Sequence, residues 1–183
     1  SNMKKSFILT IVMLFSVAAS AVAAVPQSRK ERKAAEAIQD SINHEVAVTA
    51  MKDMNFVIEA DRLILTNGEN VMVQSNVNFV SVEDDRAVIQ VSPLRGPGIN
   101  GVGGITVDGT VSDVRFDTDK KGNIYMSMNV LGAVASCRVS VSLPKGGSTA
   151  RVTIDPNYSS DDISMVGKIV PAELSRVHEA PAI

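Results

Sequence analysis

The pattern nearest to a known chemical motif is a run of glycines within residues 93–104. Gly96, Gly98 and Gly101 have the G-x-G-x-x-G spacing with which a dinucleotide site approaches pyrophosphate. Such a site needs a helix that opens at the third glycine, because the helix N-terminus binds the phosphates. Here Pro97 lies inside the motif, and the residues that follow have a strand-like pattern. The sequence therefore favours a wide loop between strands, and it predicts no cofactor.

Two aspartates have the spacing that opens a calcium-binding loop. Asp117 and Asp119 take its first and third positions, and Gly122 takes the sixth. The fifth and twelfth positions should supply oxygen ligands, but they are Lys121 and Met128. Because a cation stands where a ligand is needed, we interpret the segment as a hairpin turn and predict no metal site.

The remaining acids, bases and nucleophiles form no recognisable catalytic set. The two histidines, His44 and His178, are far apart in the sequence, and no G-x-S-x-G motif marks a serine nucleophile. Cys137 alternates with polar residues on an apolar strand face, which favours a buried thiol over a reactive one. The paired acids at residues 84–85 and 161–162 are interpreted as turn and strand-start residues. We therefore predict no catalytic residues, and a hydrolase that uses dispersed carboxylates stays open as an alternative.

The long loop at residues 93–104 is the predicted contact surface. It exceeds the roughly two to five residues that a hairpin needs, and long loops on β scaffolds often carry recognition. Arg95 offers a forked donor for a carboxylate or phosphate, and the glycines let a partner's backbone come close. A plain connection between two sheets would explain the loop equally well. The residues expected to make contact are Leu94, Arg95, Gly96, Gly98, Ile99 and Asn100.

An amphipathic helix is predicted over residues 30–52, within an N-terminal segment of residues 25–54. Apolar residues recur there at intervals of three and four. Ser28 can cap the start of the helix, although the basic side chains of the first turn oppose the helix dipole. The apolar stripe contains Ala35, Ile38, Ile42, Val46, Ala50 and Met54.

After this helix, apolar and polar residues alternate over residues 55–171, which is typical of antiparallel strands. We predict a mainly β domain, a single antiparallel meander of about eight strands that forms either a barrel or a two-layer sandwich. One of these strands is expected to place Val71, Val73, Val77 and Phe79 on one face, and residues 172–183 are expected to form a flexible tail. Turns are expected at Asn67-Gly68, Asp84-Asp85, Asp108-Gly109, residues 120–123 and residues 145–147.

The N-terminal residues predict export. Residues 3–24 combine a basic start, an apolar run and small residues at the end, as a cleavable signal peptide does, and Ser1 and Asn2 are interpreted as a cloning scar. Cleavage would remove two lysines and no acids, so the formal charge of −2 becomes −4, which disfavours nucleic acid as a partner. No other segment is apolar enough to span a membrane. Because the single cysteine, Cys137, is far from the cleavage site, we predict a periplasmic or secreted protein without a lipid anchor.

Four segments carry a resemblance to a known family. They are NFVIEADR at residues 55–62, RAVIQVSPLRGPG at 86–98, GGITVDGTVSDV at 103–114 and ISMVGKIVP at 163–171. With the lysine-led signal and the charged helix, they resemble the exported proteins of Gram-negative gut anaerobes grouped as domain-of-unknown-function family 4251. The resemblance implies export and a β-rich fold, and it transfers no catalytic residues.

The sequence as a whole favours an exported, soluble, non-catalytic binding or envelope-associated protein. Its partner would be an unidentified protein or small molecule. A carrier of a small apolar ligand is one alternative, because Met126, Met128 and Val139 could line the lumen of a barrel, although methionines at strand spacing are more often core residues. The hydrolase with dispersed carboxylates is the other.

Overall fold

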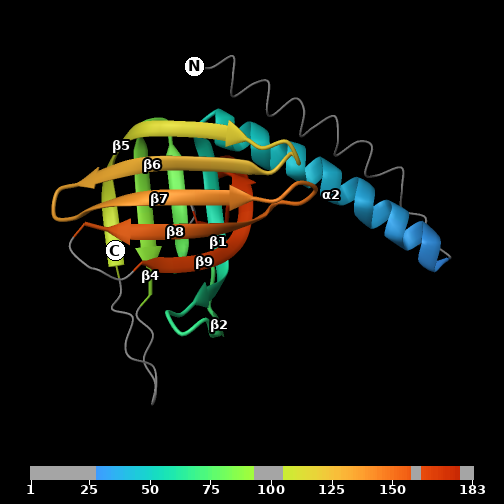
Figure 1. Ribbon diagram of the computed structural model, residues 1–183, viewed down its shortest axis with the longest axis horizontal. Coiled ribbons are helices and arrows are strands. Elements are labelled where there is room, and N and C mark those ends of the chain that lie inside the picture. Colours follow the sequence, from blue (N-terminus) through green and yellow to red (C-terminus); the bar gives the residue numbers. More distant parts are fainter. Residues whose placement is uncertain (1–27, 93–104, 158–161, 178–183) are drawn as a thin grey trace. The chain divides into compact units, whose positions relative to one another are not determined.

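The computed structural model describes residues 28–92, 105–157 and 162–177. These residues belong to two compact units that meet between Ile38 and Gln39. The first unit contributes the beginning of a helix, and the second contains the rest of that helix and all of the strands (Figure 1). No helix in the described part of the chain is both long and apolar enough to cross a membrane.

The helix α2 spans Arg29–Lys52, close to the predicted bounds. Ser28 caps it as expected: the Ser28 hydroxyl accepts a hydrogen bond from the Glu31 backbone N–H at 3.2 Å, and the Glu31 carboxylate accepts one from the Ser28 N–H at 2.9 Å. The predicted apolar stripe is buried only near its C-terminal end, because Ile38 is 63% exposed. The residues of α2 that join the interior core are Ala47, Val48, Ala50 and Met51.

Eight strands of the second unit form a closed antiparallel barrel. In barrel order they are β1, β3, β4, β5, β6, β7, β8 and β9, and β9 pairs with β1 to close the ring. The short β2 adds to β1 beside β3. This arrangement confirms the predicted mainly β meander and selects the barrel. The bounds are β1 Asn55–Ile64, β2 Asn70–Met72, β3 Phe79–Glu83, β4 Arg86–Val91, β5 Ile105–Thr118, β6 Ile124–Gly132, β7 Ser136–Leu143, β8 Thr149–Pro156 and β9 Ile163–Pro171.

The strand expected to run from Val71 to Phe79 is two strands, β2 and β3, so that prediction was wrong. Both strands pair with the same edge of β1. Six residues separate β2 from β3 along the chain, whereas only two residues of β1 separate the positions with which they pair. The surplus residues leave the ladder as a loop. Asn78 fixes the end of this loop, because its amide donates to the Gln74 carbonyl oxygen at 2.8 Å and accepts from the Ser92 N–H at 2.9 Å. Alternation in the sequence continues through this loop and therefore hides it.

The turn expected at Asp108-Gly109 is also absent, because both residues lie inside β5. Gly109 faces Gly132 of β6 directly, and a Cβ atom on Gly109 would lie 2.3 Å from the Leu131 carbonyl oxygen. The glycine therefore permits a close approach of two strands rather than a reversal of the chain. The turn at Asn67-Gly68 does exist, but only Gly68 has a positive φ, and the Leu65 N–H donates to the Glu69 carbonyl oxygen at 2.8 Å to close it.

The barrel interior is filled by inward-facing side chains of all eight strands. Met126, Met128 and Val139, which could have lined a ligand lumen, belong to one continuous cluster of buried side chains. Cys137 is buried in the same cluster at 4% exposure, as predicted. Burial, with a smaller contribution from the charge of Asp155, raises the pKa of its thiol to about 11. The interior therefore acts as a packed core.

A second apolar cluster lies outside the barrel, over β1 and its neighbours. Val57 and Phe79 point outward there and are covered by Ala172 and Val177. The segment that covers them contains a 3-10 helix, Ala172–Leu174, and was expected to be part of a flexible tail. As far as Val177 the structure differs from that expectation, because outward-facing apolar residues on β1 and β3 give the segment a surface to bury.

Candidate functional site

The contact loop predicted from the sequence cannot be placed. Residues 93–104, with Leu94, Arg95, Gly96, Gly98, Ile99 and Asn100, lie outside the described residues. The loop therefore stays a prediction.

Other candidates from the sequence have structural roles. Asp119 closes the β5–β6 turn: its carboxylate accepts from the Lys121 N–H at 2.8 Å and from the Asn123 N–H at 2.9 Å. His44 lies with its Nδ1 atom 2.9 Å from the Gly147 carbonyl oxygen, so it joins α2 to the β7–β8 turn. Asp84 occupies the β3–β4 turn with a φ of +53°. Within the described residues, no group of three or more His, Cys, Asp or Glu could hold a metal ion.

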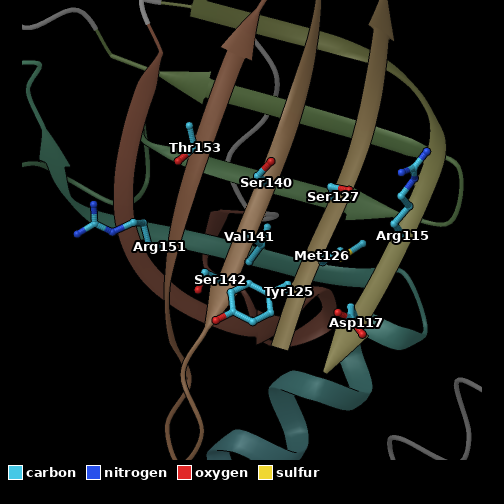
Figure 2. A pocket seen from close by; sticks show the side chains of 10 residues that line it. All are labelled: Arg115, Asp117, Tyr125, Met126, Ser127, Ser140, Val141, Ser142, Arg151 and Thr153. Atoms are coloured by element: carbon cyan, nitrogen blue, oxygen red, sulfur yellow. The ribbon is translucent and has the colours of Figure 1, made fainter. Parts of the chain in front are cut away.

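A shallow depression on the outer face of the barrel is the candidate site. It has a volume of about 350 Å³ and lies across β5, β6, β7 and β8, which run side by side (Figure 1). We call it the outer groove. Arg115 and Arg151 lie at its two sides, with hydroxyl groups between them (Figure 2). The residues that line it are Arg115, Asp117, Tyr125, Met126, Ser127, Ser140, Val141, Ser142, Arg151 and Thr153.

The strand register explains why the outer groove is hollow. One row of directly opposed residues crosses the four strands as Arg115, Ser127, Ser140 and Thr153. Its last three side chains are small hydroxyls that form a low floor. The next row crosses as Asp117, Tyr125, Ser142 and Arg151. Tyr125 and Arg151 in that row are larger and stand beside the floor.

A β-bulge brings Arg115 into this row. The pairing of β5 with β6 shifts between Ser112 and Arg115, and Asp113 within the bulge has a φ of +51°. With an unbroken register, Val114 would face Ser127 and Arg115 would point inward. The bulge instead directs Arg115 outward and turns Phe116 toward the core. The sequence contains no turn signal at this point, so alternation alone could not assign Arg115 to the groove.

The two arginines of the outer groove are free to meet a ligand. Both are exposed, and neither forms an ion pair with another described residue. The ion pair that the described residues do contain joins Arg86 of β4 to Asp108 of β5, where the Arg86 Nε atom donates to Asp108 Oδ1 at 2.8 Å. This hydrogen bond lowers the pKa of Asp108. Among the described residues, Arg115 and Arg151 have no such partner.

The lining residues suit binding better than catalysis. Asp117 is the one carboxylate among them, and they include no histidine or cysteine. General acid–base chemistry on a glycoside or ester needs a second titratable group within reach. The formal charge of the lining is +1, on a chain with a formal charge of −2. The outer groove therefore offers hydroxyl groups and two guanidinium groups to an anionic partner.

The fold and this surface define a closed eight-stranded antiparallel barrel with a packed interior and a shallow groove on its outside. Residues 39–169 match a protein-family model described as a domain of unknown function, DUF4251, and the chain belongs to this family. The matched range begins within α2 and ends within β9, so it contains β1 to β8 and most of β9.

A solved structure from this family is similar to the chain. It is the crystal structure of a DUF4251 family protein from Bacteroides eggerthii, with 38% sequence identity and a TM-score of 0.75. The match covers 80% of this chain and 99% of that one. None of the curated proteins matches the chain. The resemblance inferred from the four sequence segments is thereby confirmed.

Proposed function

We propose that this protein is an exported, non-catalytic binding module whose ligand occupies the outer groove. The observation that carries the proposal is the pair of exposed arginines, Arg115 and Arg151, on opposite sides of a hydroxyl-lined floor. A guanidinium group without an internal carboxylate partner is a ready donor for a carboxylate or phosphate on a ligand. The protein therefore binds an anionic, polar partner at this face.

The packed interior disfavours the alternative of an apolar-ligand carrier. Met126, Met128 and Val139 are nearly inaccessible to solvent and contact other core residues. A ligand in the lumen would have to displace several of them, and interiors packed at this density tolerate little added volume.

The outer groove also gives no support to a hydrolase. Two acids that converge in a concave site would have favoured that alternative, whereas Asp117 is the one acid in the lining. A single exposed carboxylate can accept hydrogen bonds from a ligand without acting as an acid or base.

Export is part of the proposal and has its own test. Residues 3–24 have the pattern of a cleavable signal. Expression in a Gram-negative host, followed by N-terminal sequencing of the periplasmic and secreted fractions, should give a chain that begins near Val25. A chain that keeps residues 3–24 and stays in the cytoplasm would contradict export.

Binding at the outer groove is tested with two unrelated anionic probes, an oligogalacturonate of four units and a hexaglutamate peptide. Isothermal titration calorimetry of the mature chain should detect binding of at least one probe. The variant that combines Arg115→Gln and Arg151→Gln should lose it.

Arg176→Gln is the matched control, because it removes an exposed arginine outside the groove. It should bind as the parent chain does. Failure of both probes to bind, or equal loss of binding in the control, would contradict the proposed function.

A further inference from the structure

We propose that the ligand of the outer groove is an acidic oligosaccharide that carries carboxylate groups and lies across the strands from Arg115 to Arg151. This inference rests on the proposed function and names the chemical class that the groove selects. Its elements are the span between the arginines, the hydroxyl floor, the absence of a free strand edge and the ring of Tyr125.

The span between the arginines requires an extended ligand. Arg115 is on β5 and Arg151 is on β8, so three strand spacings separate them. At about 4.8 Å per spacing, the backbone positions lie roughly 15 Å apart across the sheet. Figure 2 shows the two guanidinium groups directed away from each other, and in this arrangement one small anion cannot contact both. A chain of several linked units with an anionic group near each end can.

The floor between the arginines matches a ligand rich in hydroxyl groups. Ser127 and Ser140 each carry a hydroxyl that can both donate and accept a hydrogen bond, and the Thr153 hydroxyl lies 3.4 Å from the Ser164 hydroxyl. Sugar hydroxyls have the same double capacity, so the two surfaces can pair in several orientations. Asp117 adds an acceptor beside Arg115 and can take a hydrogen bond from a sugar hydroxyl.

The closed sheet disfavours an extended peptide at the same place. Peptides commonly bind to a sheet by adding a strand at a free edge. Each of the four strands β5 to β8 pairs with a neighbour on both sides, so the groove has no such edge.

Tyr125 supplies an amphipathic wall for a sugar ring. Its side chain is 43% exposed, and its hydroxyl group lies 3.4 Å from the Asp119 carboxylate, to which it donates. Figure 2 shows its ring beside Ser142 and between the two arginines. An aromatic face of this kind can contact the C–H face of a pyranose while the hydroxyls of the sugar stay paired.

The class is tested by comparing three matched probes in isothermal titration calorimetry. They are tetragalacturonate, its methyl ester, which has the same sugar backbone without charge, and hexaglutamate, which has charge without sugar. Tetragalacturonate should bind at least about tenfold more tightly than the methyl ester, which lacks the charge-assisted contacts, and at least about tenfold more tightly than hexaglutamate, which lacks hydroxyls to pair with the floor. Raising the salt concentration should weaken its binding, because the arginines are exposed.

Each other result has a definite meaning. If hexaglutamate binds as tightly as tetragalacturonate and needs both arginines, the groove is an anion site and the oligosaccharide class is wrong. Equal binding of the methyl ester would also overturn it, because charge would play no part. If no probe binds, the proposed function fails together with this inference.

Variants of the floor give a second test that leaves the charges in place. Ser140→Phe puts a large ring in the centre of the groove and should abolish tetragalacturonate binding. Thr110→Phe places the same ring at an exposed position of β5 outside the groove and should leave binding unchanged. Circular dichroism should show that both variants fold. Undiminished binding by Ser140→Phe would show that the ligand does not lie on this floor.

Discussion

Two outer surfaces of the same barrel differ in what their outward-facing residues do. On β1 and β3, Val57 and Phe79 point outward and are buried under the segment that contains Ala172 and Val177. On β5 to β8, the outward-facing residues around the outer groove are small hydroxyl residues, Asp117, Tyr125 and two arginines, and no described segment covers them. We call these the covered face and the open face. The covered face adds a second buried apolar cluster to the protein, whereas the open face does not.

The comparison shows which outward positions are constrained by stability. The inward side chains of all eight strands already form one continuous core. The covered face adds a second apolar layer with its own polar clamp, because the Ser175 hydroxyl donates to the Glu59 carboxylate at 2.7 Å. On the open face, the side chains that line the outer groove form no ion pair with another described residue. Its side chains are therefore available to bind a partner.

The largest expected effect is the loss of an aromatic ring from the covered face. Phe79→Ala removes a buried side chain and should lower the free energy of unfolding by about 3 kcal/mol. Tyr125→Ala removes an exposed ring from the open face and should cost less than about 1 kcal/mol. Urea denaturation of the two variants measures the difference. Equal losses would remove the distinction between the faces.

The next effect concerns the polar clamp of the covered face. Ser175→Ala deletes the hydrogen bond to Glu59 and should lower the free energy of unfolding by about 1 kcal/mol. Ser140→Ala makes the same change on the open face, where the value should stay within about 0.5 kcal/mol of the parent chain. A neutral Ser175→Ala would mean that the C-terminal segment adds no stability through this bond.

A pH-dependent effect is expected at Asp119, in the turn that ends the open face. Hydrogen bonds from the backbone and side chain of Asn123 hold the pKa of this carboxyl below its usual value of 3.8. The pKa is lowered only in the folded state. Ionised Asp119 therefore stabilises the protein at pH values above 3.8, and this contribution is lost as the pH falls through the folded pKa.

The advantage of the parent chain over Asp119→Asn in thermal melting should therefore be full near pH 6 and should shrink below about pH 3.8. An advantage that grows on acidification would have the wrong sign.

The smallest effect on stability is expected for the groove arginines. Arg115→Gln and Arg151→Gln remove exposed charges without ion-pair partners among the described residues, so the free energy of unfolding should change by less than about 0.5 kcal/mol. The same urea experiments measure it. A loss of more than about 1 kcal/mol would show that these side chains stabilise the barrel.

The sequence predicted the barrel well because the alternation of apolar and polar residues within each strand is a local, periodic signal. Alternation placed Cys137 and Val139 inside, and the capping residue Ser28 marked the start of α2. Departures from a regular ladder were missed. The loop between β2 and β3 continues the alternating pattern, and the glycine at position 109 serves a close approach that depends on a strand distant in sequence.

The outer groove was missed for a related reason. It depends on the register of four strands, which sets small residues opposite one another, and on the bulge in β5, which turns Arg115 outward. Neither can be read from one strand alone. A signal was present in the serines that alternate with apolar residues in β6 and β7, but only the pairing shows that they form a common floor.

The most direct test of a ligand site on the open face is an NMR titration of the ¹⁵N-labelled mature chain with tetragalacturonate, repeated with hexaglutamate. The account predicts that the largest changes in amide chemical shift occur at Ser127, Ser140, Thr153 and their neighbours on β5 to β8, whereas the amides of β1 and β3 change little. Changes centred on the covered face, or none on the open face with either probe, would contradict it.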